Sequence, residues 1–238
     1  CRKTNEQKTI LRGDLVDMTR TRFDEQLGEL HVELIKMGSL CEEAISLSAQ
    51  ALEKNEEKTK ERVFALETEI DQMEREVETH CMRLLLHQQP VARDLRAISA
   101  ALKMISDMER IGDQAADIVE LVPYIAQSEC KNKVDIAEMA KATVSMVTDS
   151  VEAFVKKDLK LAEQVIEKDD IVDEMFASIK KKLMELVRSQ DVDAEPALDL
   201  LMAAKYFERI GDHAVNVAEW VEYSVTGIHK SSEHHLGN

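Results

Sequence analysis

Two segments of the chain each place three acidic or amide side chains four positions apart: Glu109, Asp113 and Asp117 in the first, and Glu208, Asp212 and Asn216 in the second. Residues at i, i+4 and i+8 of an α-helix lie on one face, about 6 Å apart along the axis. Carboxylate oxygens are hard ligands that suit cations such as Mg, Ca, Mn or Fe. Each segment, if helical, therefore carries a stripe of candidate metal ligands.

A further pair of acids with the same spacing lies upstream of each stripe. Glu67 and Asp71 precede the first stripe, and Asp169 and Asp173 precede the second. On a helical wheel both pairs border the apolar side of their helix, so they can face a neighbouring helix. We therefore predict that each pair joins the stripe of its own half in a metal site, which can hold more than one ion.

The simpler interpretation of these acids is a solvated helix face, and two observations weigh against it. Like charges at i, i+4 destabilise a helix by about 0.2–0.5 kcal/mol per pair, yet both halves keep them. Gly112 and Gly211 lie within the two stripes, where each costs about 1 kcal/mol relative to alanine. Such a glycine often marks the close approach of another backbone or of a ligand.

The elements that must position these acids are long helices. Apolar residues recur at alternating spacings of three and four along most of the chain, which is typical of helices packed along a seam. Seven Gly and three Pro in 238 residues leave little room for short strands. We predict an all-α fold whose six helices cover residues 24–54, 57–87, 91–126, 134–156, 159–189 and 195–226.

The chain also repeats internally. The sequence Glu-Arg-Ile-Gly-Asp at 109–113 recurs unchanged at 208–212, and the acids at 67 and 71 recur at 169 and 173. We predict two similar antiparallel three-helix bundles, residues 18–127 and 131–228, related by a pseudo-twofold axis because a duplicated chain offers matching faces. Residues 1–17 and 229–238 are expected to be flexible extensions.

The third helix carries a second apolar face that needs a partner of its own. Leu95, Ile98, Leu102 and Ile105 lie away from its main seam. Such a face can be covered by the first helix, by the other bundle or by another subunit. We expect the bundles to pack together and the whole chain to form a homodimer.

Charge and composition narrow the partners. Thirty-one Lys and Arg against 47 Asp and Glu give a net charge of −16, whereas nucleic acids and anionic membranes attract basic surfaces. We therefore expect no nucleic-acid partner. No apolar run is long enough to insert into a membrane. The first 17 residues lack a signal-peptide core, and the four cysteines form no C-x-x-C pair, so a cytoplasmic location is expected.

The sequence lacks the usual catalytic motifs. Di-iron oxidases built on helical bundles use E-x-x-H on two helices, and no E-x-x-H occurs here. A P-loop, G-x-G-x-x-G and G-x-S-x-G are also absent. We expect a non-catalytic protein. The alternatives are a metal-dependent hydrolase or oxidase acting through the stripes, and a structural helical scaffold that binds no metal.

Three segments carry a resemblance to a known family. They are the twin Glu-Arg-Ile-Gly-Asp segments, Gln-Pro-Val-Ala-Arg-Asp-Leu-Arg at 89–96 and Phe-Asp-Glu-Gln-Leu at 23–27. Over residues 20–228 the chain resembles the PhoU family of phosphate-transport regulators. The resemblance implies a cytoplasmic adaptor, usually oligomeric, that negatively regulates phosphate uptake and the phosphate-starvation response. Such an adaptor links the ATPase of the phosphate ABC transporter to a sensor histidine kinase.

The resemblance also implies metal clusters at the acidic motifs, with Fe, Zn, Mn, Mg and Ca as candidate ions. Two features depart from the family pattern. Residues 193–198, Asp-Ala-Glu-Pro-Ala-Leu, stand where the second half would repeat Arg-Asp-Leu-Arg. Asn216 stands in place of the third acid. An amide ligates through one oxygen and carries no charge, so we expect the second site to bind metal more weakly.

Overall fold

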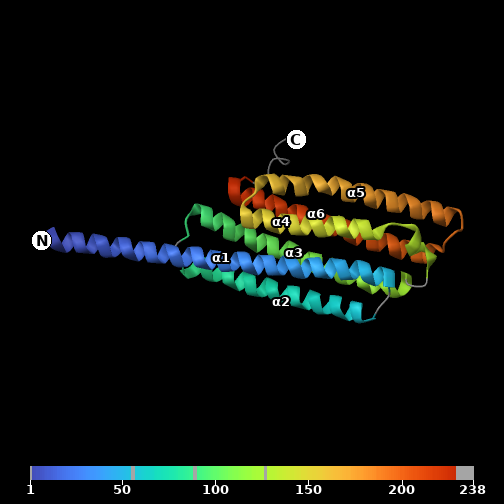
Figure 1. Ribbon diagram of the computed structural model, residues 1–238, viewed down its shortest axis with the longest axis horizontal. Coiled ribbons are helices and arrows are strands. Elements are labelled where there is room, and N and C mark those ends of the chain that lie inside the picture. The colour runs from blue at the N-terminus through green and yellow to red at the C-terminus, as the bar shows by residue number, and fades with distance from the viewer. Residues whose placement is uncertain (1, 55–56, 88–89, 126–127, 229–238) are drawn as a thin grey trace.

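The computed structural model describes residues 2–54, 57–87, 90–125 and 128–228. Within these ranges the chain forms α-helices and one short 3₁₀ helix, with no strand, which confirms the all-α prediction (Figure 1). The elements in chain order are α1 (Arg2–Lys54), α2 (Glu57–His87), α3 (Ala92–Ile125), η1 (Glu129–Lys133), α4 (Ile136–Lys156), α5 (Leu159–Arg188) and α6 (Ala194–Thr226).

The first helix is longer than expected. It begins at Arg2 instead of near residue 24, and its N-terminal part projects beyond the rest of the molecule (Figure 1). The expected start coincided with the beginning of the apolar seam. Residues 2–22 contain no proline and a single glycine, so no strong stop signal interrupts the helix. The other expected extension, residues 229–238, lies outside the described residues.

Specific caps mark where helices begin and end, close to the predicted helix bounds. The Asp158 carboxylate caps α5 by accepting hydrogen bonds from the backbone N–H groups of Lys160 and Leu161, at 3.0 and 3.1 Å. Lys157 takes a left-handed conformation (φ 55°) after α4, and Gly227 does so (φ 79°) after α6. The two-residue connection between α4 and α5 makes these helices antiparallel neighbours.

The six helices form two bundles that pack against each other. Helices α1, α2 and α3 contact one another, as do α4, α5 and α6. Between the bundles, α3 packs along α6 and α1 packs against α4. Each of these pairs joins a helix to its own counterpart in the repeat, as a pseudo-twofold axis requires. Helices α2 and α5 lie on opposite flanks (Figure 1).

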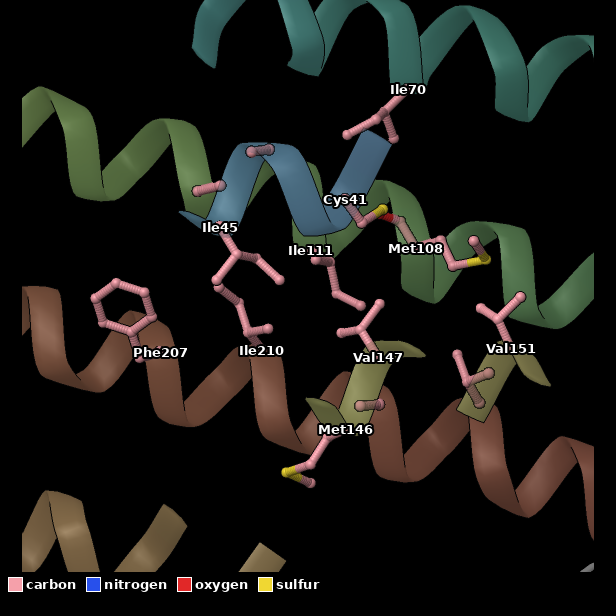
Figure 2. Close-up of a cluster of buried hydrophobic side chains, with 14 of the residues drawn as sticks. Cys41, Ile45, Ile70, Met108, Ile111, Met146, Val147, Val151, Phe207 and Ile210 are labelled. Carbon is pink, nitrogen blue, oxygen red and sulfur yellow. The ribbon is translucent and has the colours of Figure 1, made fainter. Parts of the chain in front are cut away.

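A single apolar core runs through both bundles. Figure 2 shows Ile45 of α1, Ile111 of α3, Val147 of α4 and Ile210 of α6 in one buried cluster. The Cys41 thiol lies in the same core and donates a hydrogen bond to the Met108 carbonyl oxygen at 3.4 Å. The two repeats therefore share the interior that stabilises them.

The shared core also covers most of the second apolar face of α3. Ile98 and Ile105 are buried, and Leu102 is half-buried. Because α3 packs along α6, burial of the two isoleucines requires no second subunit. Leu95 keeps 44% of its surface exposed. The expected homodimer stays a prediction.

None of the helices in the described part of the chain combines the length and the apolar character that crossing a membrane requires.

Candidate metal centre

Three predicted ligands of the first repeat meet at the contact between α2 and α3. Glu67 and Asp71 of α2 and Asp113 of α3 each offer one carboxylate oxygen, and these oxygens all lie within 4.8 Å of one another. All three residues are half-buried. Oxygen ligands bind Ca²⁺ at about 2.3–2.6 Å and Mg²⁺ at about 2.0–2.1 Å. One divalent ion can therefore reach all three oxygens with small side-chain adjustments.

A close contact between the two helices places these acids together. Gly112 faces Ile70, and a β-carbon on this glycine would lie 3.0 Å from the Ile70 Cδ1 atom. The missing side chain therefore lets α2 approach α3 at the level of Asp113. The mid-helix glycine predicted the close approach of a backbone or a ligand, but the structure places a side chain there, that of Ile70, between Glu67 and Asp71 in the sequence.

Glu109 lies at the edge of this cluster. Burial and the neighbouring Asp113 raise the pKa of Glu109, and Arg110 acts in the opposite direction. The Arg110 guanidinium contacts both acids, at 3.5 Å from Glu109 Oε2 and 3.1 Å from Asp113 Oδ2. Arg110 is exposed and offsets part of the negative charge, while Asp71 adds to the field at Glu109.

Asp117, the third residue of the first stripe, lies outside the three-acid group. Burial, Glu120 and Asp113 raise the pKa of Asp117, while Arg209 of α6 lowers it. Asp117 is thus close enough to the other bundle for the charge of Arg209 to act on it. Each step of four residues turns about 40° around a helix, so the third position of a stripe rotates away from the α2 side.

The second repeat gathers the corresponding acids between α5 and α6. Burial, followed by the charges of Asp212, Asp173 and Glu208, raises the pKa of Asp169 to about 6. Burial and Glu208 also raise the pKa of Asp212. The Asp169 Oδ1 atom is buried without a hydrogen-bond partner, and it would lie 3.3 Å from a β-carbon on Gly211.

The two acidic clusters differ in detail. Among the described residues, Glu67, Asp71 and Asp113 form the one group whose three ligand atoms meet the 4.8 Å spacing. In the second repeat Glu208 is buried and forms an ion pair with Lys205. The expected weaker metal binding of the second site stays a prediction.

Asn216 lies at the contact between the bundles. Its side-chain amide donates a hydrogen bond to Asp107 Oδ1 of α3 at 2.9 Å, and the same oxygen lies 3.0 Å from Nδ1 of His213. Asn216 therefore reaches the first repeat, as Asp117 reaches towards the second. Asp107 could not be predicted from the sequence, because it belongs to no spaced motif and its partner His213 is 106 positions away.

Both acidic clusters suit a divalent cation in their chemistry. Their donors are carboxylates, the ligand type that hard cations prefer. In the first repeat three such oxygens converge, and in the second an oxygen of Asp169 is buried and without a hydrogen-bond donor. A bound cation would satisfy this oxygen and would offset both the burial and, after it, the repulsion that raise the pKa values of Glu109, Asp169 and Asp212.

The fold and site define a class: duplicated three-helix bundles, each with acids gathered where its second helix meets its third. Comparison with known families makes the class specific. Residues 34–122 and 136–221 each match the PhoU domain, and the chain therefore belongs to the PhoU family. The resemblance inferred from the twin Glu-Arg-Ile-Gly-Asp segments is confirmed.

Relatives match this chain over most of their length. A phosphate-specific transport system accessory protein PhoU homolog of Clostridium acetobutylicum is 37% identical over 212 residues, which cover 88% of this chain and 97% of the relative. A protein of the same description from Aquifex aeolicus is 37% identical over 186 residues, covering 78% of this chain and 84% of the relative.

Solved structures show the same fold. The crystal structure of PhoU from Pseudomonas aeruginosa superposes with a TM-score of 0.77 at 29% identity, covering 87% of this chain and 100% of that one. The phosphate transport system regulatory protein PhoU from Streptococcus pneumoniae superposes with a TM-score of 0.79 at 27% identity, covering 87% of this chain and 98% of that one.

Proposed function

We propose that this protein is a non-catalytic accessory protein of phosphate transport, which restrains phosphate uptake and the phosphate-starvation response. The observation that carries the proposal is the pair of PhoU domains, which together span most of the chain. Relatives that match along this span are described as phosphate-specific transport system accessory proteins. The family resemblance extends the proposal to a cytoplasmic adaptor between the transporter ATPase and a sensor histidine kinase.

Two buried cysteines and His213 are consistent with a role without catalysis. Cys41 and Cys81 are buried in the core, where burial raises the pKa of the Cys41 thiol and raises that of Cys81 to about 12. Thiols of this kind stay protonated at neutral pH and react slowly. His213 is hydrogen-bonded to Asp107 at the contact between the bundles, without a serine or cysteine among its described hydrogen-bond partners.

The acidic clusters have a structural part in this proposal. Glu67, Asp71 and Asp113 would hold a divalent ion with Glu109 at its edge, and Asp169, Asp173, Glu208 and Asp212 would form the weaker second site. A bound ion supplies positive charge where the helices bring carboxylates together. It would tie α2 to α3, or α5 to α6, and so make each bundle more rigid. Fe, Zn, Mn, Mg and Ca are the candidate ions.

The adaptor proposal is tested by deleting the gene in its own organism. In medium rich in phosphate, the deletion strain should express phosphate-starvation genes that the parent strain keeps silent. Reintroducing the intact gene should restore repression. Normal repression in the deletion strain would refute the proposal.

The competing enzymatic and scaffold interpretations are separated from it by two further measurements. Turnover of phosphoesters or oxygen by the metal-loaded protein, lost on Asp113→Ala, would support a hydrolase or oxidase. Purified protein that retains no metal, before or after chelation and reloading, would favour the structural scaffold. Light scattering at micromolar concentration tests the proposed homodimer, and a strictly monomeric mass would count against it.

A further inference from the structure

A groove of about 830 Å³ lies between α2, α3 and α6, apart from the acidic cluster at Glu67. Its volume falls within the range of about 300–1,000 Å³ that is typical of ligand pockets. Both bundles contribute to it, since α2 and α3 belong to the first and α6 to the second. Its lining combines acidic, apolar and hydrogen-bonded side chains.

The hydrogen-bonded part of the lining is held in place. Asp107 Oδ1 accepts the Asn216 amide at 2.9 Å and lies 3.0 Å from His213 Nδ1, and all three residues line the groove. The side chains of Asp107 and His213 are only 16% and 23% exposed. These bonds link α3 to α6, so the groove exists before any ligand binds. A preformed surface loses little conformational entropy on binding.

The walls of the groove are acidic. Glu74 and Glu78 lie one turn apart on α2, and Glu219 lies on α6. Two basic residues of α3, Lys103 and Arg110, also line the groove, but four acids outnumber them. Lys103 is exposed, and Arg110 already contacts Glu109 and Asp113. Among the ion pairs formed by the described residues, none includes Glu78 or Glu219. Two facing walls thus offer carboxylates to a cation.

The remaining lining is apolar and adaptable. Met82 is 47% exposed, and Leu102 and Trp220 are half-buried. Methionine adjusts its shape to different apolar partners, and tryptophan offers a large rigid surface. This surface suits an aliphatic or aromatic side chain of a partner, which would lie between the acidic walls.

The corresponding face of the second repeat has a different chemistry. The counterparts of Glu74, Glu78 and Asp107 are Phe176, Lys180 and Tyr206. There the Lys205 ammonium lies over the Phe176 ring, 5.5 Å from its centre. The acids on the α2 wall and Asp107 therefore belong to one face of the duplicated fold, whereas Glu219 keeps an acid, Glu120, as its counterpart.

We propose that this groove docks a cationic amphipathic helix of a partner protein. An amphipathic helix places apolar anchors at i, i+3 or i+4, and i+7 along one face, and lysine or arginine beside them would meet Glu78 on one wall and Glu219 on the other. The proposal rests on the proposed adaptor function, for which it names the surface and the class of segment that binds there.

Trp220 gives a local readout, because it is the one tryptophan in the sequence. The probes are overlapping 20-residue peptides that cover the transporter ATPase and the cytoplasmic part of the sensor kinase, titrated against the full chain. At least one peptide with a cationic amphipathic pattern should bind, as measured by fluorescence anisotropy, and should change the emission of Trp220. Absence of any such peptide would overturn the proposal.

Charge exchange then tests the assigned contacts. Glu78→Lys with Glu219→Lys should raise the Kd of the bound peptide at least tenfold. The same double variant should bind a version of that peptide whose lysines are replaced by glutamate. Lys180→Glu, at the position equivalent to Glu78, is the matched control and should leave binding unchanged. Equal binding of the peptide by the charge-reversed and unaltered chains would overturn the proposal. A change in Trp220 emission that light scattering traces to self-association of the chain alone would also overturn it.

These results are independent of the test of the adaptor function. If the deletion strain loses repression but no peptide binds in the groove, the docking proposal fails and the adaptor function stands. If the deletion strain represses normally while the peptide binds and responds to charge exchange, the adaptor function fails and the groove remains a peptide site.

Discussion

Divalent cations should raise the thermal stability of this protein through the three-acid group of the first repeat. In the metal-free protein Glu67, Asp71 and Asp113 hold their carboxylate oxygens within 4.8 Å of one another, so their charges repel. An ion between them removes this repulsion and binds the folded state alone, since the unfolded chain does not bring α2 and α3 together. Folding and ion binding are therefore linked.

The size of the effect follows from the linkage and from the shared core. At an ion concentration about a hundredfold above Kd, binding adds about 2.7 kcal/mol to the free energy of unfolding. Because one core runs through both bundles, we treat the cooperative unit as about 200 residues, for which 1 kcal/mol shifts Tm by about 2–4 °C. The expected rise in Tm is therefore about 5–10 °C.

The assay compares melting curves in chelator and in excess metal, for the intact protein and for a pair of variants. Asp71→Asn with Asp113→Asn should raise the Tm of the metal-free protein by relieving repulsion, and should lose most of the rise caused by metal. Arg110 loses its contact with Asp113, but such an exposed pair contributes only about 0–1 kcal/mol. Asp173→Asn with Asp212→Asn is the matched pair in the second repeat, and its effect should be smaller.

Two results would refute this reasoning. A Tm that Mn, Fe, Zn, Mg and Ca all leave unchanged would support the solvated-face interpretation of the acids. A metal-induced rise that survives Asp71→Asn with Asp113→Asn would place the bound ion elsewhere.

Three further predictions concern other parts of the fold. Burial and neighbouring acids raise the pKa of Asp169 to about 6, so between about pH 4 and 6 the folded state keeps a proton that the unfolded state has released. The free energy of unfolding therefore falls as pH rises through that window. In chelator, Asp169→Asn should have a higher Tm than the intact protein at pH 7, and the difference should fade towards pH 4. Gly112→Ala gains about 1 kcal/mol of helix propensity but brings a methyl group to 3.0 Å from Ile70 Cδ1, where overpacking costs about 1–3 kcal/mol, so we expect a net loss of about 1 kcal/mol in urea unfolding, part of which Ile70→Val should restore; a variant more stable than the intact protein would contradict the tight contact. Asp107→Ala leaves His213 and Asn216 without their shared acceptor and should lower the free energy of unfolding by about 0.5–1.5 kcal/mol, the net worth of a hydrogen bond, because water can reach the exposed Asn216 amide; a variant as stable as the intact protein would show that this link between the bundles contributes nothing.

Helix positions and the repeat were predictable because they depend on short-range patterns. The apolar seam and the capping residue Asp158 act within a few positions, so a single sequence contains their signal. The start of α1 was not predictable in this way. A seam marks where a helix meets the core, whereas residues 2–22 continue the helix beyond the bundle (Figure 1).

The acidic clusters were predicted in part. The spacing of Glu67, Asp71 and Asp113 contained enough information to place them together, because Gly112 marks where their helices approach. The spacing also included Asp117 and Asn216, although the structure places both where the bundles meet. Which helix faces a given residue depends on how the two bundles are rotated against each other, and a spacing rule within one helix does not contain that angle.

The packing of α3 along α6 resembles an interface between two subunits, except that here both halves belong to one chain. A lone repeat would leave Ile98, Ile105 and Ile111 of α3 without the other half of their core, and a second copy of the same repeat would be the natural cover. Joining two copies in one chain fixes their concentration relative to each other. It also allows each copy to change independently of the other. Asp107 of the first half is hydrogen-bonded to Asn216 of the second. At the matching positions, Tyr206 stands in place of Asp107 and Asp117 in place of Asn216.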